Sequence, residues 1–258
     1  MSLLFPDIAV RGPAVDARQY VEKGTRGATV LGYFAAVFGV IAATAVSYGV
    51  FLVVLLFTPL FAWYLRRTAL ARIHGSGVRV DEAQFPQIHQ CVQTFRQRLG
   101  LTKDVETYIV EANIANAFAV RLGRKNIILL TDDLIHGCLA IEKPQALSFV
   151  IAHELAHIAL GHNGVLKSWM AQWMKKLGRL NEYSADATAT ALLGDRQLAY
   201  QGLLLLTVGF ALVPYVNHER LLRQAEEVAL DKYTKKAERP LSHPLLLNRV
   251  RRVLQPGL

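Results

Sequence analysis

Residues 28–65 form a long apolar stretch without a charged side chain: ATVLGYFAAVFGVIAATAVSYGVFLVVLLFTPLFAWYL. As a single helix this stretch would run about 57 Å, which far exceeds the roughly 30 Å hydrocarbon core of a bilayer. Two membrane-spanning helices fit better, with a turn at Ser47-Tyr48-Gly49 and a kink at Pro59 in the second helix. The alternatives are one long tilted span and a hairpin buried in a soluble protein.

Basic residues flank this stretch on both sides: Arg18, Lys23 and Arg26 before it, and Arg66, Arg67 and Arg72 after it. The expected turn contains none. Because Lys and Arg favour the cytoplasmic side of membrane spans, both ends of the hairpin are expected in the cytoplasm. The protein is therefore predicted to be integral to the inner or plasma membrane, with its remaining domain facing the cytoplasm.

The rest of the chain alternates between helical and strand patterns. Residues 66–80 predict a helix beside the membrane, and residues 81–99 predict an amphipathic helix with apolar side chains at helical spacing. Three short runs predict strands at 107–110, 117–121 and 126–131, and Gly123-Arg124-Lys125 separates the last two as a hairpin turn. The apolar segment 203–216 is too short for a span and predicts a core helix or one that rests on the membrane.

These elements predict an α+β protein with a small sheet beside a helical core and an N-terminal transmembrane helical hairpin. The chain divides into an N-terminal arm at 1–27, the two-helix hairpin at 28–65 and a domain at 66–258. With 258 residues, 52% of them hydrophobic, it is long enough for one domain and a membrane part. Cys91 and Cys138 are far apart in the sequence, which predicts reduced, buried thiols.

The net charge of +9 needs a partner or a surface. The basic flanks of the hairpin could lie against anionic headgroups of the lipid bilayer, together with Lys167, Lys175, Lys176 and Arg179. No recognisable nucleic-acid-binding motif accompanies the charge. The lipid bilayer is therefore an expected partner, and nucleic acid is not.

Residues 153–157 carry the most specific chemical signal, His153-Glu154-Leu155-Ala156-His157, within an apolar segment that predicts a buried helix between Pro144 and Gly161. Histidines four residues apart share one helix face and can bind one metal ion together. The glutamate between them can reach a water on that metal, an arrangement typical of zinc-dependent peptide hydrolysis. The alternative is a chance motif whose histidines are hydrogen-bonded core residues.

A catalytic zinc site needs a third protein ligand. His162 is one candidate, but the extended metzincin pattern fails because Leu160 and Asn163 stand where it needs glycine and histidine. Glu182 is the better candidate, since Glu182 and Asp186 lie four residues apart on a helix predicted over 177–193. One carboxylate can bind the metal and the other can accept the free ring N–H of a ligand histidine. The alternative is a solvated acidic pair near a helix start.

The HExxH motif followed by a helix with E-x-x-x-D resembles the gluzincin metallopeptidases. Three further segments resemble the HtpX-type membrane proteases and the related CAAX prenyl proteases: Asn116-Ala117-Phe118-Ala119, Gly161-His162, and Ser242-His243-Pro244 with Arg249 beyond it. The resemblance covers about residues 66–255. The interval between the HExxH helix and the next is short and polar here, whereas HtpX-type proteases commonly carry further hydrophobic segments there. A simpler topology, without the prenyl-peptide chamber of the CAAX proteases, is therefore expected.

The resemblance implies a gluzincin domain with one zinc ion per chain and a polypeptide substrate. The implied roles are as follows: His153, His157 and Glu182 bind zinc, Glu154 is the general base, Asp186 orients a ligand histidine, His243 stabilises the oxyanion, and Arg249 pairs with the acids of the Glu182 helix. Asn116, Ala117, Phe118 and Ala119 would form an edge strand that receives the substrate backbone. Of Ala117 and Ala119, one is expected to face the substrate and the other the sheet.

The sequence thus favours a membrane-anchored zinc endopeptidase, and the resemblance suggests quality control of membrane or unfolded proteins. The alternative is a membrane-tethered adaptor or binding protein with a structural zinc site. Glu154 discriminates between them, because a structural site needs no general base and fills its fourth position with a protein ligand.

Overall fold

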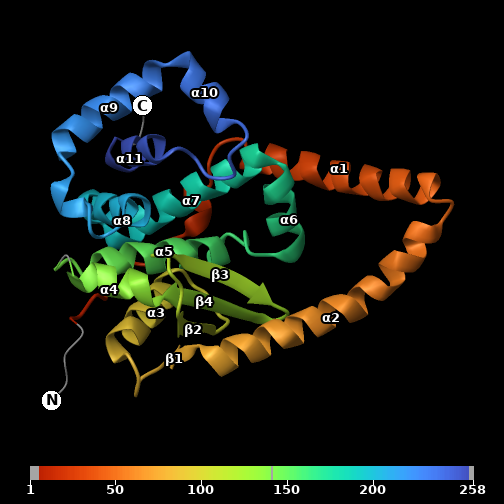
Figure 1. The fold of residues 1–258 in the computed structure, drawn as a ribbon, viewed down its shortest axis with the longest axis horizontal. Helices are drawn as coiled ribbons and strands as arrows, with labels where there is room; N and C mark the ends of the chain where they lie inside the picture. The colour runs from red at the N-terminus through yellow and green to blue at the C-terminus, as the bar shows by residue number, and fades with distance from the viewer. Residues whose placement is uncertain (1–5, 141, 256–258) are drawn as a thin grey trace.

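A computed structural model describes residues 6–140 and 142–255. The N-terminal half contains η1 (Ala17–Tyr20), α1 (Thr25–Val46), α2 (Val50–Ser76), β1 (Val78–Val80), α3 (Pro86–Arg98), β2 (Val105–Val110), β3 (Ala117–Leu122) and β4 (Lys125–Thr131). The C-terminal half is helical: α4 (Asp132–Ala140), α5 (Ala146–Ala159), α6 (Val165–Trp173), α7 (Lys175–Leu193), α8 (Arg196–Val208), η2 (Val213–Tyr215), α9 (His218–Leu230), α10 (Lys232–Glu238) and α11 (Leu246–Leu254). The fold is thus helix-rich α+β with one small sheet (Figure 1).

The two apolar helices α1 and α2 project from the rest of the protein and are joined at Ser47–Gly49, where the sequence predicts the turn (Figure 1). Both helices are long and apolar enough to cross a membrane, and almost none of their side chains are buried. This exposure is the opposite of what a hairpin buried in a soluble protein requires. The helix predicted over 66–80 is not separate, because α2 continues unbroken through Pro59 to Ser76.

The amphipathic helix predicted over 81–99 begins only at Pro86. Asp81 instead forms a turn, in which its carboxylate accepts hydrogen bonds from the N–H groups of Ala83 and Gln84. Phe85 then takes a left-handed conformation with φ of 59°, and Pro86 starts the helix. The residues just before this turn form β1, a strand too short for its pattern to predict.

The sheet has the strand order β1-β2-β4-β3, so β3 lies at an edge as the sequence analysis expects. β2 and β4 are parallel, whereas the β1–β2 and β3–β4 pairs are antiparallel. A tight turn at Gly123, where φ is +70°, joins β3 to β4 and matches the predicted hairpin. The three predicted strands are present, each a little longer than expected.

The register of β3 corrects one expectation about its free edge. The N–H of Thr131 donates to the carbonyl of Asn116, which makes 116 and 131 a hydrogen-bonded pair. Bonded and non-bonded pairs alternate along an antiparallel ladder. Ala117 and Ala119 are therefore both in non-bonded pairs, and both direct their backbone groups to the open edge. The expectation that one of them faces the sheet is wrong, because residues two apart share one orientation.

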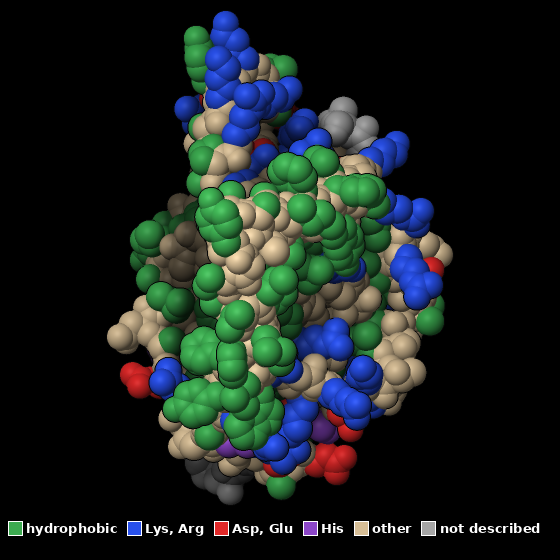
Figure 2. Space-filling model, turned by 90° about the vertical axis from the view of Figure 1, so that its right-hand side faces the viewer, with side chains coloured by type: hydrophobic (Ala, Val, Ile, Leu, Met, Phe, Trp, Pro, Cys, Tyr) green, Lys and Arg blue, Asp and Glu red, His purple; other side chains and the backbone are tan. Residues whose placement is uncertain are grey.

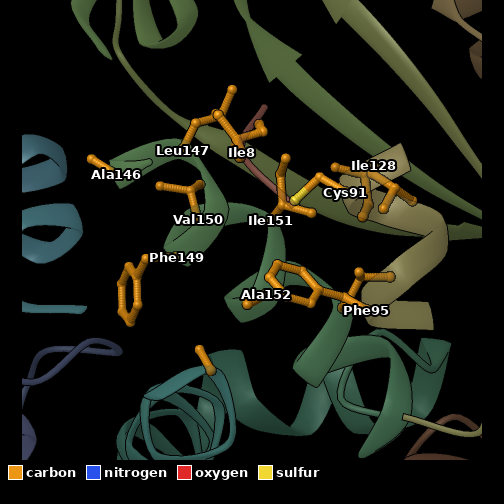
Figure 3. Close-up of a cluster of buried hydrophobic side chains, with 14 of the residues drawn as sticks. Ile8, Cys91, Phe95, Ile128, Ala146, Leu147, Phe149, Val150, Ile151 and Ala152 are labelled. Atoms are coloured by element: carbon orange, nitrogen blue, oxygen red, sulfur yellow. The ribbon is translucent and has the colours of Figure 1, made fainter. Parts of the chain in front are cut away.

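The core lies between the sheet and the helical layers, and α5 runs through it (Figure 3). Side chains on nearly every face of α5 are buried, and it packs against α7, α8 and β3. Gly202 of α8 permits a close approach, since a Cβ there would lie 2.5 Å from the ring of Phe149. Buried helices of this kind can hold polar side chains in place only where those side chains have partners.

The N-terminal arm is packed against the domain rather than free. Ile8 is fully buried in the core, and Arg98 donates hydrogen bonds to the carbonyls of Val10, Pro13 and Leu192. Farther along the chain, the apolar segment 203–216 is a core helix only in its first part. There α8 ends at Val208, because Gly209 has φ of +78° and breaks the helix. Cys91 and Cys138 are buried free thiols, as expected.

Candidate metal centre

Helices α5 and α7 pack side by side and bring His153, His157 and Glu182 to one point. The Nε2 atoms of the two histidines are 3.1 Å apart. The two carboxylate oxygens of Glu182 lie 3.6 Å from His153 Nε2 and 3.5 Å from His157 Nε2. Zinc–nitrogen bonds of about 2.0–2.1 Å require tetrahedral donor separations of about 3.3–3.4 Å. The three side chains therefore fit the donor set and spacing of a zinc ion.

Asp186 lies one helical turn beyond Glu182, behind His153. Its Oδ1 is 3.0 Å from His153 Nδ1, the ring nitrogen that faces away from the metal position. Arg249 donates two hydrogen bonds of 2.8 and 2.7 Å to the same carboxylate. Its Nη2 also lies 3.7 Å from Oε2 of Glu182. Burial alone would raise the pKa of Asp186, but Arg249 and His153 outweigh it and lower that pKa. Asp186 is thus a fixed carboxylate that can orient His153.

The negative charge of Glu182 and Asp186 favours a cation in the cluster. Burial alone would lower the pKa of His153, but Asp186 and Glu182 raise that pKa to about 10. Burial likewise opposes ionisation of Glu182, yet hydrogen bonds from His153, His157 and His243 hold its pKa well below the usual value. The acids therefore stay negative and attract positive charge onto the histidines. A divalent metal between the three donors would supply that charge instead of protons.

His162, which the sequence offers as a possible third ligand, lies on the far side of His157. The Nδ1 atoms of the two rings are 3.0 Å apart. Burial, together with the neighbouring charges, lowers the pKa of His162 to about 2, so its ring is neutral. A neutral His162 can accept the Nδ1 hydrogen of His157, which leaves Nε2 of His157 free for the metal. His162 is therefore placed to orient a ligand rather than to serve as one.

Glu154 is enclosed between the metal-ligand cluster and the edge strand. Burial raises the pKa of its carboxyl, an effect that the neighbouring His153 and His157 oppose. The backbone N–H of Ala119 in β3 also opposes this rise in the pKa. That effect is consistent with the register, in which Ala119 directs its N–H away from β4. The arrangement places a carboxylate of raised proton affinity beside both the cluster and the open strand edge.

Comparison with known proteins gives a family that agrees with this geometry. The model of peptidase family M48 matches residues 82–175. The chain is 24% identical to the protease HtpX homolog of Methanocaldococcus jannaschii, over 80% of this chain and 70% of that protein. The HtpX homologs of Persephonella marina and Nostoc sp. are 31% and 34% identical over 37% and 39% of this chain. These two alignments cover only 31% and 33% of those relatives.

The chain is thus similar to HtpX-type members of peptidase family M48. No solved structure matches it. The segment matched by the family model includes His153, Glu154 and His157 but ends before Glu182. The place of Glu182 among the candidate ligands therefore rests on the packing of α7 against α5, and the same holds for Asp186 and Arg249.

The loop that carries His243 lies at the mouth of the site. His243 Nδ1 lies 3.3 Å from a carboxylate oxygen of Glu182, while 69% of its side chain remains exposed. Arg179 of α7 donates to the carbonyls of Glu238, Arg239 and Leu241, which fixes the start of the loop. The sequence does not predict that Arg179 holds this loop, because the contact joins segments about sixty residues apart.

The predicted substrate-binding segment lies at the start of the open edge of the sheet. Asn116 precedes β3, and its side-chain oxygen accepts the N–H of Ala117. The side chains of Ala117 and Ala119 pack toward the core, whereas Phe118 is 41% exposed on the other face of the sheet. The N–H of Ala117 thus has a partner within the chain. Farther along the same edge, Arg121 belongs to the next non-bonded pair and directs its backbone outward.

Proposed function

We propose that the protein is a membrane-anchored zinc endopeptidase with a gluzincin-type site. The observation that carries the proposal is the meeting of His153, His157 and Glu182 at zinc-like spacing, with Glu154 beside them. A buried cluster of this composition is costly to a fold unless a cation satisfies it. The family match and the HtpX names of the relatives support a protease.

In this proposal His153, His157 and Glu182 hold one zinc ion per chain. When bound, zinc supplies a Lewis acid and lowers the pKa of a coordinated water toward about 7. Glu154 acts as the general base: it accepts the proton of the attacking water and passes it to the leaving amine. Its raised pKa supports the second transfer, because a more basic carboxylate holds the proton until the amine departs.

The surrounding residues position these groups. Asp186, fixed by Arg249, and His162 hold the rings of the two histidines from their far nitrogens. His243 lies at the exposed mouth, where a donor can stabilise the oxyanion of the tetrahedral intermediate. The segment from Asn116 to Ala119 and the edge beyond it receive the substrate as an additional antiparallel strand. A substrate strand bound there would accept the outward N–H of Ala119, close to Glu154.

The membrane hairpin supports a role near the bilayer. We place residues 28–65 in the inner or plasma membrane and the domain 66–258 in the cytoplasm. Of the arm 1–27, residues 6–27 pack against that domain. An edge strand recognises backbone more than side chains. This mode suits unfolded or membrane-protein segments of varied sequence, and it supports proteolytic quality control as the physiological task.

A second candidate is an adaptor that retains a structural zinc. His243 favours it, because a histidine 3.3 Å from Glu182 could supply a fourth protein donor. X-ray absorption at the zinc edge separates the two candidates. Four protein donors would support the adaptor, and three protein donors with one light-atom ligand from solvent would support the peptidase.

The decisive experiment replaces Glu154 with Gln in the full-length protein. Glu154→Gln keeps the size of the side chain but removes the base, and general acid–base groups contribute roughly 10²- to 10⁴-fold to a rate. Cleavage of an unfolded polypeptide should fall by at least that factor, while metal analysis still finds one zinc per chain. A matched variant, His157→Ala, should lose both zinc and cleavage. Wild-type turnover in Glu154→Gln would show that another group is the base.

A further inference from the structure

A pocket outside the metal cluster opens beside the first turns of α1. It has a volume of about 590 Å³ and lies between the start of α1, the end of α5, and the helices α6 and α7. Val30, Leu160 and Leu177 contribute apolar walls. At its inner end it reaches His162, the residue that contacts His157 from behind. The pocket therefore joins the base of the membrane hairpin to the back of the metal cluster.

The charged side chains that line this pocket are all cationic. Arg18, Arg26 and Lys167 line it, and no carboxylate does so among the residues that the structure describes. The Lys and Arg side chains that form ion pairs within 6–140 and 142–255 are others, such as Arg179 and Arg252. Three unpaired cations around one hollow attract an anion, and guanidinium and ammonium groups are suited to phosphate oxygens.

The pocket lies where the hairpin would enter the bilayer. The uncharged stretch begins at residue 28, and the pocket is lined by α1 residues from Thr25 to Val30. Figure 2 views the protein from the side toward which the α1–α2 hairpin projects. Hydrophobic side chains cover the middle of this face, and Lys and Arg side chains lie around them. A lining that combines cations with apolar side chains, beside the start of the uncharged stretch, suits a lipid headgroup at the membrane surface.

Helix α6 beside the pocket has the character of an interfacial helix. Its exposed large hydrophobic residues are Val165, Leu166, Trp169 and Trp173, and their spacing gathers them on one side of the helix. Its other side packs on α1 through Met170, where a Cβ at Gly32 would lie 2.2 Å from the methionine methyl group. Tryptophan favours the membrane–water interface. Since α6 is tied to α1, its exposed side and the pocket share one level relative to the bilayer.

From this arrangement we infer that the pocket binds the phosphate-bearing headgroup of an anionic phospholipid of the surrounding bilayer. The three cations hold the headgroup, and the acyl chains continue along the exposed apolar faces of α1 and α6. A free phosphate ion would use the same cations, but it would leave the apolar walls and the tryptophan face without a role. The inference rests on the membrane hairpin and is independent of proteolysis.

Lipid binding to the full-length protein in detergent micelles tests the inference directly. Dioleoylphosphatidylglycerol and dioleoylphosphatidylcholine are titrated separately, and retained lipid is counted by native mass spectrometry. Wild type should retain one phosphatidylglycerol in a saturable manner and bind phosphatidylcholine at least tenfold more weakly. Arg26→Gln and Lys167→Gln should each weaken phosphatidylglycerol binding about fivefold, which corresponds to about 1 kcal/mol for one basic residue near the membrane surface.

Lys23→Gln is the matched control, since Lys23 is exposed, precedes α1 by two residues and does not line the pocket. It removes the same charge and should leave binding within twofold of wild type. An equal loss in Lys23→Gln would overturn the inference in favour of diffuse surface charge. A third titration uses inorganic phosphate alone. If phosphate displaced the lipid at concentrations similar to those of the lipid itself, the pocket would be a small-anion site and the lipid assignment would be wrong.

Discussion

Helices α2 and α5 are both strongly apolar, yet they occupy opposite environments. No residue of α2 is buried in the protein, whereas α5 is buried on nearly every face. Length separates them first, because the 14 residues of α5 rise only about 21 Å and cannot cross a bilayer. Polar content separates them second, since α5 carries histidines and a glutamate that need partners. The comparison teaches that an apolar helix is assigned to lipid or to protein by its length and by its polar residues.

The largest effect is expected from a charge in the middle of α5. Ile151 is fully buried in the cluster of hydrophobic side chains around α5 (Figure 3). Ile151→Arg should therefore abolish the folded domain, since an uncompensated buried charge costs several kcal/mol. Protease resistance and zinc content of the purified protein measure this outcome. Ile151→Val is the control and should cost only about 0.5–1.5 kcal/mol. A folded, zinc-loaded Ile151→Arg protein would mean that α5 is not the core helix.

An arginine in α2 should weaken membrane insertion and leave the folding of the domain unchanged. Leu56→Arg places a cation near the middle of the apolar part of α2, at a cost of about 2.5–3.5 kcal/mol for insertion. The fraction of protein that resists alkaline extraction from membranes should fall, while zinc binding persists. Leu65→Arg, near the end of the apolar stretch, is the control and should be tolerated because the side chain can reach the interface. Equal extraction of both variants would contradict a spanning α2.

A smaller effect is expected from a residue of α7 that supports a polar side chain of α5. Asp186→Asn keeps the shape of the side chain that faces His153 but removes the charge that Arg249 and His153 share. Loss of such an orienting partner typically weakens metal binding about 10- to 100-fold. Competition with a chelator measures the zinc affinity. Asp104→Asn is a surface control, since Asp104 pairs only with Arg96 at an exposed position. An unchanged affinity in Asp186→Asn would remove Asp186 from the site.

The sequence predicts those contacts of the site that join residues close together in the chain, and it predicts contacts between distant segments less directly. The pairing of His153 with His157 follows from helical spacing alone, so the sequence predicts it directly. The meeting of α5 with α7 is tertiary, and the sequence analysis reached Glu182 by weighing ligand chemistry and by family resemblance. His162 was weighed as a ligand, but the turn at Gly161, where φ is +67°, returns it behind His157.

The sequence pattern also fails to predict three other features of the fold, each of which depends on a specific local or tertiary contact. The strand β1 has three residues, too few to display an alternating pattern. The late start of α3 depends on the side-chain turn at Asp81, which competes with a helix. The N-terminal arm is mixed in charge, yet Ile8 reaches the core because Arg98 binds the carbonyls around it. In each case a specific contact overrides the local pattern.

The smallest expected effect concerns the open edge of β3, which lies between the buried site and the solvent. Arg121 belongs to a non-bonded pair, so Arg121→Pro removes an outward N–H without breaking a bond to β4. A single lost hydrogen bond is worth about 0.5–1.5 kcal/mol, and KM for an unfolded substrate should rise about two- to tenfold with kcat and zinc content unchanged. Arg121→Ala, which keeps the N–H, controls for the lost charge. Val120→Pro removes an N–H that bonds to β4 and should instead destabilise the sheet. If Arg121→Pro and Arg121→Ala gave the same KM, the substrate would not pair with this edge at Arg121, and the strand-addition model would have to end before it.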